Sequence, residues 1–245
     1  MKWSLLAWAA LFLSNLPAMT YQSNMEDWLN TGTEEVRVQK LISLGVERHA
    51  AELKVKEKIK WRLIRSESHH EIALLFLPCG ALSDTSFLYL LESTDHVWHV
   101  TDRVGFDCHY DDSVSFEVAA LRSPDVDDVL VHHECEGHGT GFLQQNFKVF
   151  AVASSRFKLV LNTEEILKVS GWPGSHELNQ RSLFATIRSG GTDLGFIQET
   201  RCTEDNGRLT IQERKFRWSP AMFRFLPSQF VKVGVADAKS RAACQ

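Results

Sequence analysis

The residues best able to do chemistry lie together between Phe106 and Phe142. This stretch holds two of the five cysteines and four of the ten histidines of the chain. It also holds nine acidic residues against one basic residue, Arg122. Imidazole, thiolate and carboxylate groups are the side chains from which proteins build zinc, transition-metal and calcium sites. We therefore treat residues 106–142 as the candidate functional stretch.

The run His133-Glu-Cys-Glu-Gly-His138 does not match the H-E-x-x-H motif of zinc metalloproteases. Its second histidine follows the first at i+5, and a helix would turn these two side chains in nearly opposite directions. Three glycines at alternate positions from Gly137 would each destabilise a helix by about 1 kcal/mol. The sequence therefore argues against a protease of this class.

A β-hairpin accounts for the same residues better. Alternation in a strand would place Val129, Val131, His133 and Cys135 on one face, and Leu130, His132 and Glu134 on the other. We predict a disulfide between Cys108 and Cys135, which would hold their Cα atoms roughly 4.4–6.8 Å apart. His109, His133 and His138 would then come together.

Three imidazoles with an open fourth position suit zinc or another transition metal, and the aspartates would suit calcium. Two alternatives stay open. The histidines are polar strand and loop residues with local hydrogen bonds, or the two cysteines bind metal instead of each other. No cofactor is firmly indicated.

Other catalytic and binding motifs are absent from the sequence or lack the right context. The glycine run before Phe142 leads into a strand-like segment, whereas a dinucleotide fingerprint opens a helix. No G-x-S-x-G nucleophile motif is present. The basic and aromatic run from Glu213 to Trp218 is typical of a strand with one solvent-exposed face, and nucleic-acid binding is not expected.

The N-terminus has the pattern of a signal peptide. Lys2 precedes a short apolar run from Leu5 to Leu13, and Ser14-Asn-Leu-Pro-Ala18 ends this run in a small residue. The apolar run is shorter than the roughly 20 residues needed to span a bilayer. We predict a signal peptide over residues 1–20, a secreted or periplasmic location, and no membrane span after its removal. Export permits disulfides, and five cysteines leave at least one unpaired within the chain.

The rest of the chain divides into a short helical part and a long β part. Thr33 is a suitable N-cap with Glu34 and Glu35 in the first turn, so we predict a helical N-terminal extension over residues 21–53. The alternation of apolar and charged residues from Leu53 to Trp61 favours a strand from about Lys54 onward.

Turn-forming residues then recur every eight to twelve residues, which is typical of an all-β protein. The strands we expect are Ile72–Leu77, Phe87–Glu92, Val97–Thr101, Val114–Leu121, Val129–Glu134, Phe142–Ala153, Phe157–Leu161, Leu183–Ile187, Leu194–Cys202 and Leu209–Trp218. Asn206-Gly207 is a strong hairpin signal between the last two. The predicted fold is mainly β, an antiparallel meander that forms a sandwich, a barrel-like sheet or an incomplete propeller.

The predicted β domain covers residues 54–235, with a connector at 170–175 that could divide it and a tail at 236–245. Its hydrophobic content of 44% and charged content of 24% are those of a globular protein rather than a disordered one. The acidic middle lies between basic flanks at Arg37–Arg65 and Arg208–Arg241. Either the flanks neutralise the middle within the fold, or the middle attracts cations.

The absence of a complete catalytic motif favours a non-catalytic binding or structural module of the periplasm, cell envelope or exterior, with an envelope or extracellular ligand. One alternative is a metal-dependent hydrolase that uses His109, His133 and His138. Another is a carbohydrate-binding module in which Trp98, Trp172 or Trp218 stacks on sugars.

Overall fold

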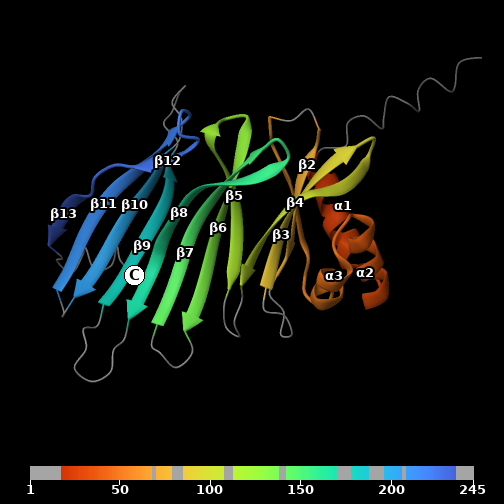
Figure 1. The fold of residues 1–245 in the computed structure, drawn as a ribbon, viewed down its shortest axis with the longest axis horizontal. Helices are drawn as coiled ribbons and strands as arrows, with labels where there is room; N and C mark the ends of the chain where they lie inside the picture. Colours follow the sequence, from red (N-terminus) through yellow and green to blue (C-terminus); the bar gives the residue numbers. More distant parts are fainter. Residues whose placement is uncertain are drawn as a thin grey trace, which may run out of the picture.

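The protein is mainly β, with three short helices followed by thirteen strands in the part of the chain that the computed structural model describes (Figure 1). That part comprises residues 18–67, 70–78, 85–107, 113–137, 142–169, 178–187, 196–205 and 208–235. All strand pairs are antiparallel. The expected β class and helical N-terminal part are confirmed.

The helices are α1 (Ala18–Asn30), α2 (Glu34–Ser43) and α3 (Arg48–Lys54). The Thr33 hydroxyl accepts a hydrogen bond from the Val36 backbone N–H, so the predicted N-cap is confirmed. The strand predicted from Lys54 is wrong, because α3 continues to this residue and the first strand begins at Lys60. Buried Ala50, Ala51, Lys54 and Val55 recur at helical spacing, and this buried face outweighs the local alternation of charges.

The strands pair in sequence order into two sheets, and neither closes into a barrel. The first sheet has the order β1-β2-β3-β4. Its strands are β1 (Lys60–Ile64), β2 (Ile72–Leu77), β3 (Thr85–Thr94) and β4 (Val97–Asp107). The predicted meander is thereby confirmed for this part of the chain.

The second sheet runs in order from β5 to β12, and β13 pairs with a separate part of β11. Its strands are β5 (Val114–Ser123), β6 (Val126–Gly137), β7 (Phe142–Ala153), β8 (Arg156–Val169), β9 (Leu178–Ile187), β10 (Phe196–Asp205), β11 (Arg208–Ser219), β12 (Arg224–Pro227) and β13 (Val231–Val235). Strands β12 and β13 were not expected from the sequence.

Two hairpins turn through two residues with positive φ. Asp95 and His96 join β3 to β4 with φ of 51° and 65°, and Ser154 and Ser155 join β7 to β8 with φ of 51° and 55°. Positive φ at both central residues is the geometry of a type I′ turn, whose twist matches that of the flanking strands. None of these four residues is glycine, so each turn carries some backbone strain.

The first sheet is the middle layer of the molecule. Ala73, Leu75 and Leu77 of β2 pack with the helices in one core cluster. Ile72, Leu74 and Phe76 of the same strand pack on the other side with residues of β6 and β7. All six residues of β2 are buried, which explains why this strand reads as an unbroken apolar run.

The sheets are also joined through polar contacts. The Asp127 carboxylate accepts from the Arg65 backbone N–H at 2.8 Å and from its guanidinium at 2.6 Å. The Asp102 carboxylate accepts from the Phe157 backbone N–H at 2.7 Å. Arg65 belongs to the basic flank and Asp127 to the acidic middle, so this pair supports neutralisation within the fold.

The second sheet curls over its own far face. Strands β8 and β9 pair only from Ile166 to Val169, so the strands beyond β9 can turn away from the plane of β5–β8. Phe147 of β7 stacks on Phe184 of β9 with ring centroids 4.4 Å apart and an interplanar angle of 10°. This inner face forms a third core cluster, which includes residues from β6, β7, β8, β10, β11 and β12.

No helix within the described ranges is long and apolar enough to cross a membrane.

Candidate functional site

The stretch 106–142 forms the end of β4, strands β5 and β6, and the start of β7. The predicted alternation on β6 is confirmed, since Val129 and Val131 pack toward the first sheet and Leu130 packs on the inner face of the second. His133 follows Val131 on the side of the first sheet and is 6% exposed. Its ring lies edge-on to Phe106, with centroids 5.6 Å apart.

His133 is hydrogen-bonded within the fold. Its Nε2 lies 2.7 Å from the backbone oxygen of Asp107, and a carbonyl only accepts, so this nitrogen carries the proton and donates. The contact holds the end of β4 against β6. A metal bound by His133 would therefore have to use Nδ1.

The structure does not describe the side chains of the other residues in the predicted metal site and disulfide. Cys108, His109 and His138 lie outside the described residues. The backbone of Cys135 pairs with Gln144, but its side chain is not described. No group of three or more His, Cys, Asp or Glu side chains is placed to hold a metal ion within the described residues. The metal site and the Cys108–Cys135 bridge stay predictions.

The neighbouring His132 points into the inner face of the second sheet. Its Nδ1 donates to the Glu165 carboxylate at 2.7 Å, and its Nε2 lies 3.9 Å from Glu117. The ring packs against Phe147 with centroids 5.1 Å apart. The hydrogen bond with Glu165 raises the pKa of His132 above its usual value, although burial opposes this shift.

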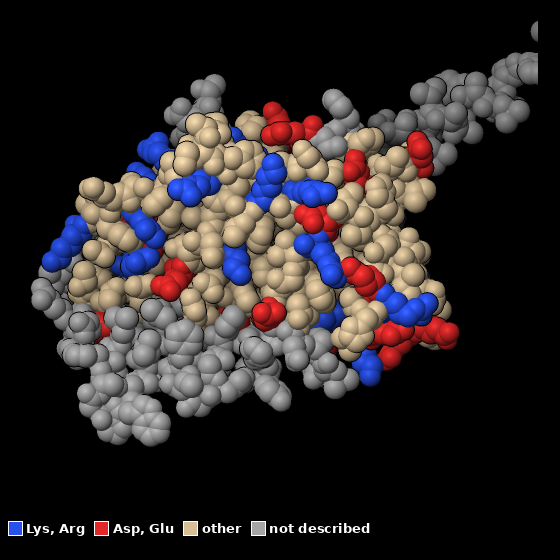
Figure 2. Space-filling view, viewed as in Figure 1, with Lys and Arg blue, Asp and Glu red and all other residues tan. Residues whose placement is uncertain are grey.

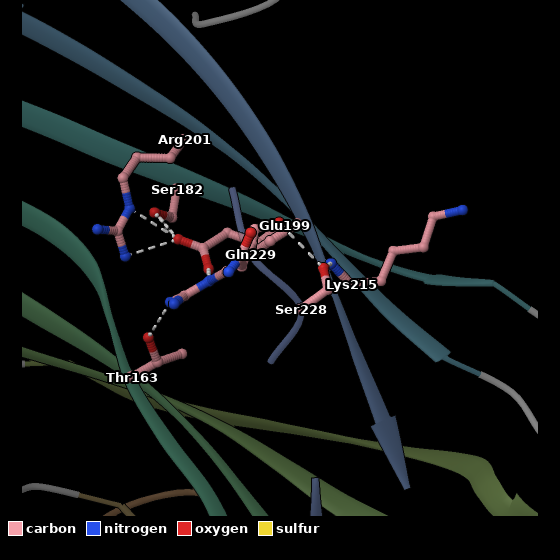
Figure 3. A network of polar contacts seen from close by, with 8 residues as sticks. Thr163, Ser182, Glu199, Arg201, Lys215, Ser228 and Gln229 are labelled. Atoms are coloured by element: carbon pink, nitrogen blue, oxygen red, sulfur yellow. Dashed lines mark hydrogen bonds and ion pairs between the residues drawn. The ribbon is translucent and has the colours of Figure 1, made fainter. Parts of the chain in front are cut away.

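Glu199 of β10 is the centre of a buried polar network on the opposite wall of the same face (Figure 3). Its side chain is completely buried. One carboxylate oxygen accepts from the Ser182 hydroxyl at 2.7 Å and from Arg201 Nε at 2.9 Å, and the other accepts from Arg214 Nε. Arg214 also donates to the Thr163 hydroxyl at 3.3 Å.

The two arginines also stack on aromatic rings. The guanidinium carbons of Arg201 and Arg214 lie 4.6 Å and 4.3 Å from the ring centroid of Phe230. Stacking of this kind leaves the guanidinium edges free for bidentate contacts. The network connects β8, β9, β10 and β11, so its first effect is to fix how the curled strands face one another.

A groove of about 340 Å³ opens beside this network, between β8 on one side and β11 and β12 on the other. It is lined by Leu159, Val160, Leu161, Asn162, Thr163, Arg214, Phe216, Arg224, Phe225, Leu226 and Pro227. Five consecutive residues of β8 line it. Because successive side chains point to opposite faces, this pattern means that the edge of the strand borders the groove.

The charge of the groove differs from that of the stretch singled out in the sequence. Its lining contains two arginines and no acidic residue. Leu159 at its rim is 53% exposed. On the face shown in Figure 2, basic side chains outnumber acidic ones over the end of the molecule that carries the C-terminal strands. The groove thus offers apolar contact together with positive charge.

The only base in the acidic stretch, Arg122, is also part of the fold. Its Nε lies 2.5 Å from the Asp128 carboxylate, and both side chains are buried. The guanidinium carbon lies 5.4 Å from the ring centroid of Trp218. Burial raises the pKa of Asp128, and the charge of Arg122 opposes this shift.

The tryptophans proposed for sugar stacking differ in how far the structure exposes them. Trp98 is 5% exposed and packs edge-on to Trp61, so its expected role as an exposed platform is wrong. Trp218 is half-buried and contacts Phe223 and Phe225. Trp172 lies outside the described residues.

Cys202 on β10 is buried and disulfide-bonded. Each of the other four cysteines falls where the side chain is not described.

Sequence reasoning missed the Glu199 network, although a signal for it was present. The hairpin signal in the sequence at Asn206-Gly207 predicts that Asp205 pairs with Arg208. These two residues are paired, and the same register places Glu199 directly opposite Arg214. The contact between His132 and Glu165 had no such signal. A β-bulge on the β7–β8 ladder shifts the pairing at Gln145 and Asn146 and leaves Glu165 without a paired residue.

Comparisons with known proteins supply no relative from which a function could be transferred. No protein-family model matches this chain, and neither a curated protein nor a solved structure matches it.

Proposed function

We propose that this protein is an exported, non-catalytic binding module that takes its ligand in the groove between β8 and β11–β12. The observation that carries the proposal is the groove itself, with its apolar and basic lining and its rim at exposed Leu159. A concave, mostly apolar site with a few convergent polar groups is the usual form of a ligand site.

The contacts of the titratable groups support binding rather than catalysis. A general acid or base must reach the substrate proton directly or through one water. Glu199 is fully buried and already accepts from Ser182 and two arginines. His132 and His133 are held by Glu165 and by a backbone carbonyl. These groups orient strands.

Two observations support export. The leader pattern over residues 1–20 is that of a signal peptide. The disulfide at Cys202 fits an oxidising compartment such as the periplasm or the exterior. Fractionation of cells that express the full chain tests this part, and accumulation of the protein with its leader intact in the cytoplasm would contradict it.

The groove can be tested with a fluorescent anilinonaphthalene sulfonate, which combines aromatic rings with one negative charge. We expect saturable binding to the mature protein. Leu159→Asp should weaken it about tenfold, which corresponds to about 1.4 kcal/mol. Val97→Asp is the matched control, because Val97 is 64% exposed and lies on the first sheet. Equal loss in both variants, or no loss in Leu159→Asp, would contradict the proposal.

A broad hydrolase screen on the same preparation tests the non-catalytic part. Robust turnover that disappears in His133→Gln would overturn it. Elemental analysis of protein purified without an affinity tag then decides the alternative of a metal-dependent hydrolase, which requires a stoichiometric metal ion.

A further inference from the structure

The groove is bordered by two strand edges that have no ladder partner in the described part of the chain. Strand β8 pairs with β7 along its length, but on its other side it pairs with β9 only from Ile166 to Val169. The residues Leu159–Thr163 therefore present an edge to the groove, whereas the Phe157 backbone N–H nearer the start of β8 already donates to Asp102. Strand β12 pairs with β11 alone. Exposed edges of this kind are templates for pairing with another strand, and proteins usually cover or shorten them.

We infer that the ligand of the groove is an extended, acidic and apolar polypeptide segment of a partner protein, which adds to the free edge of β8 as a strand. This inference rests on the proposed function, since it names the ligand of the same groove. Peptide binding by strand addition draws its affinity from main-chain hydrogen bonds and its specificity from alternate side chains.

The basic residues of the groove lining indicate that the added segment carries acidic side chains. Arg214 and Arg224 both line the groove. Lys158 directly precedes Leu159 of the lining in the sequence, and its Nζ lies 4.9 Å from the ring centroid of Phe223. An acidic side chain of the added segment would meet these groups, and a basic one would be repelled.

The apolar residues of the groove lining indicate that the added segment carries apolar side chains at alternate positions. Leu161 and Phe225 are buried in the core of the curled sheet, whereas Leu159 is exposed at the rim. Because side chains alternate in a strand, a segment with acidic residues on one face and apolar residues on the other matches both features.

The spacing of the two edges sets the movement that binding requires. Some Cα atoms of β8 and β12 come within 8 Å of each other, yet the two strands form no ladder. Neighbouring strands in a sheet lie 4.7–4.9 Å apart, so a strand between β8 and β12 needs about 9.5 Å. Strand β12 has only four residues, and we expect it to move outward when the segment binds.

The test is selection from a display library of random peptides of about ten residues, the length of a long natural strand. The target is the full mature protein, and the dye assay confirms first that its groove is open. We expect selected peptides to alternate apolar and acidic residues and to displace the dye. Arg224→Glu should weaken a selected peptide at least tenfold, whereas Arg62→Glu, at an exposed position of β1, should leave its affinity unchanged.

Peptides methylated at alternate backbone nitrogens separate strand addition from simple charge attraction. Methylation of the nitrogens that face β8 should cost at least tenfold in affinity, and methylation of the other set should cost little. Equal affinity of both methylated forms and the parent would overturn strand addition.

The remaining outcomes distinguish the two proposals. Dye binding without any selected peptide would overturn the peptide inference and leave the proposed function standing. Failure of both dye and peptide would overturn both. A concentration-dependent dimer that Leu159→Asp abolishes would show that a second copy of this chain fills the groove, and this would also overturn the inference of a separate partner.

Discussion

At the scale of single residues, the ionisable groups on the inner face of the second sheet act as internal connectors. Glu199 receives hydrogen bonds from β9, β10 and β11, and Arg214 extends the connection to β8. A carboxylate without water is tolerable only when such donors replace its hydration. Removal of the Glu199 carboxylate would leave the guanidinium groups of Arg201 and Arg214 poorly solvated and without their anion.

We therefore predict that Glu199→Gln lowers the free energy of unfolding by about 3 kcal/mol, the usual cost of breaking a buried ion pair by removing one partner. Urea denaturation followed by tryptophan fluorescence measures this value. Glu204→Gln on the same strand is the control, because Glu204 is exposed and should change stability by less than about 0.5 kcal/mol. Equal effects of the two variants would show that the network contributes nothing to stability.

The contact between His132 and Glu165 makes a pH-dependent contribution to stability. The hydrogen bond raises the pKa of His132 in the folded state, so protonated His132 stabilises the fold. This stabilisation is fully present below the unfolded-state pKa of about 6.5 and is lost as the pH rises through the higher folded-state pKa.

The stability difference between wild type and His132→Gln should therefore shrink between slightly acidic and alkaline pH. Denaturation curves across this range measure the difference. His49→Gln, at an exposed position of α3, controls for the loss of an imidazole alone. A difference that grows with pH would contradict the assigned ion pair.

At the scale of elements, the hairpin turns combine fixed register with backbone strain. His96 has φ of 65° at an exposed turn position between β3 and β4. A left-handed conformation costs a non-glycine residue roughly 1–2 kcal/mol. Glycine avoids this cost, but its greater backbone freedom in the unfolded chain offsets part of the gain in stability.

His96→Gly should therefore raise the free energy of unfolding by about 0.5–1 kcal/mol. His99→Gly is the matched control, because His99 is also exposed but lies within β4 opposite Glu92, where glycine weakens a strand. Opposite signs for the two variants are expected in thermal denaturation, and destabilisation by both would contradict the turn conformation.

The elements show which local signals the sequence carries. The prediction for β7 is correct at both ends, from Phe142 to Ala153, since turn-forming residue types flank a long apolar stretch in the sequence. Strand β2 is equally well defined. The start of β1 was missed because the alternation around Lys54 suits a strand, whereas tertiary packing of Ala50 and Ala51 keeps this segment helical. No short-range pattern contains that packing.

In the candidate site, too, features set by local sequence patterns could be predicted, and features set by tertiary packing could not. The faces of β6 could be predicted from alternation, and the pairing of Glu199 with Arg214 follows from the register that the Asn206-Gly207 hairpin signal predicts. The groove could not be predicted, because it exists only through the curl that brings β12 near β8. That curl depends on where the β8–β9 ladder stops, and no residue pattern in the sequence marks this point.

At the scale of the molecule, the short β8–β9 ladder divides the second sheet into two parts. Only Ile166–Val169 and Leu178–Arg181 pair across this junction, whereas β7 and β8 pair along their full lengths. The predicted subdivision at 170–175 lies outside the described residues, but it falls between these two strands.

We predict that backbone amides at this junction exchange with solvent faster than those of β6 and β7, because local opening there breaks few contacts. Hydrogen–deuterium exchange followed by mass spectrometry measures this difference. Peptide binding in the groove should slow exchange along Leu159–Thr163 in particular. Uniform protection across β5–β11 would show that the sheet opens as one unit.

The order of the strands also bears on how the chain reaches its native state. Each strand from β1 to β12 that lies next to another within its sheet follows or precedes it directly in the sequence. Pairing of sequence neighbours closes short loops, and folds rich in local contacts fold faster than those that depend on distant pairing. A chain delivered N-terminus first can therefore add one hairpin after another to a growing sheet. The last strands to arrive are those that close around the groove, so a waiting partner segment could join the sheet during folding itself.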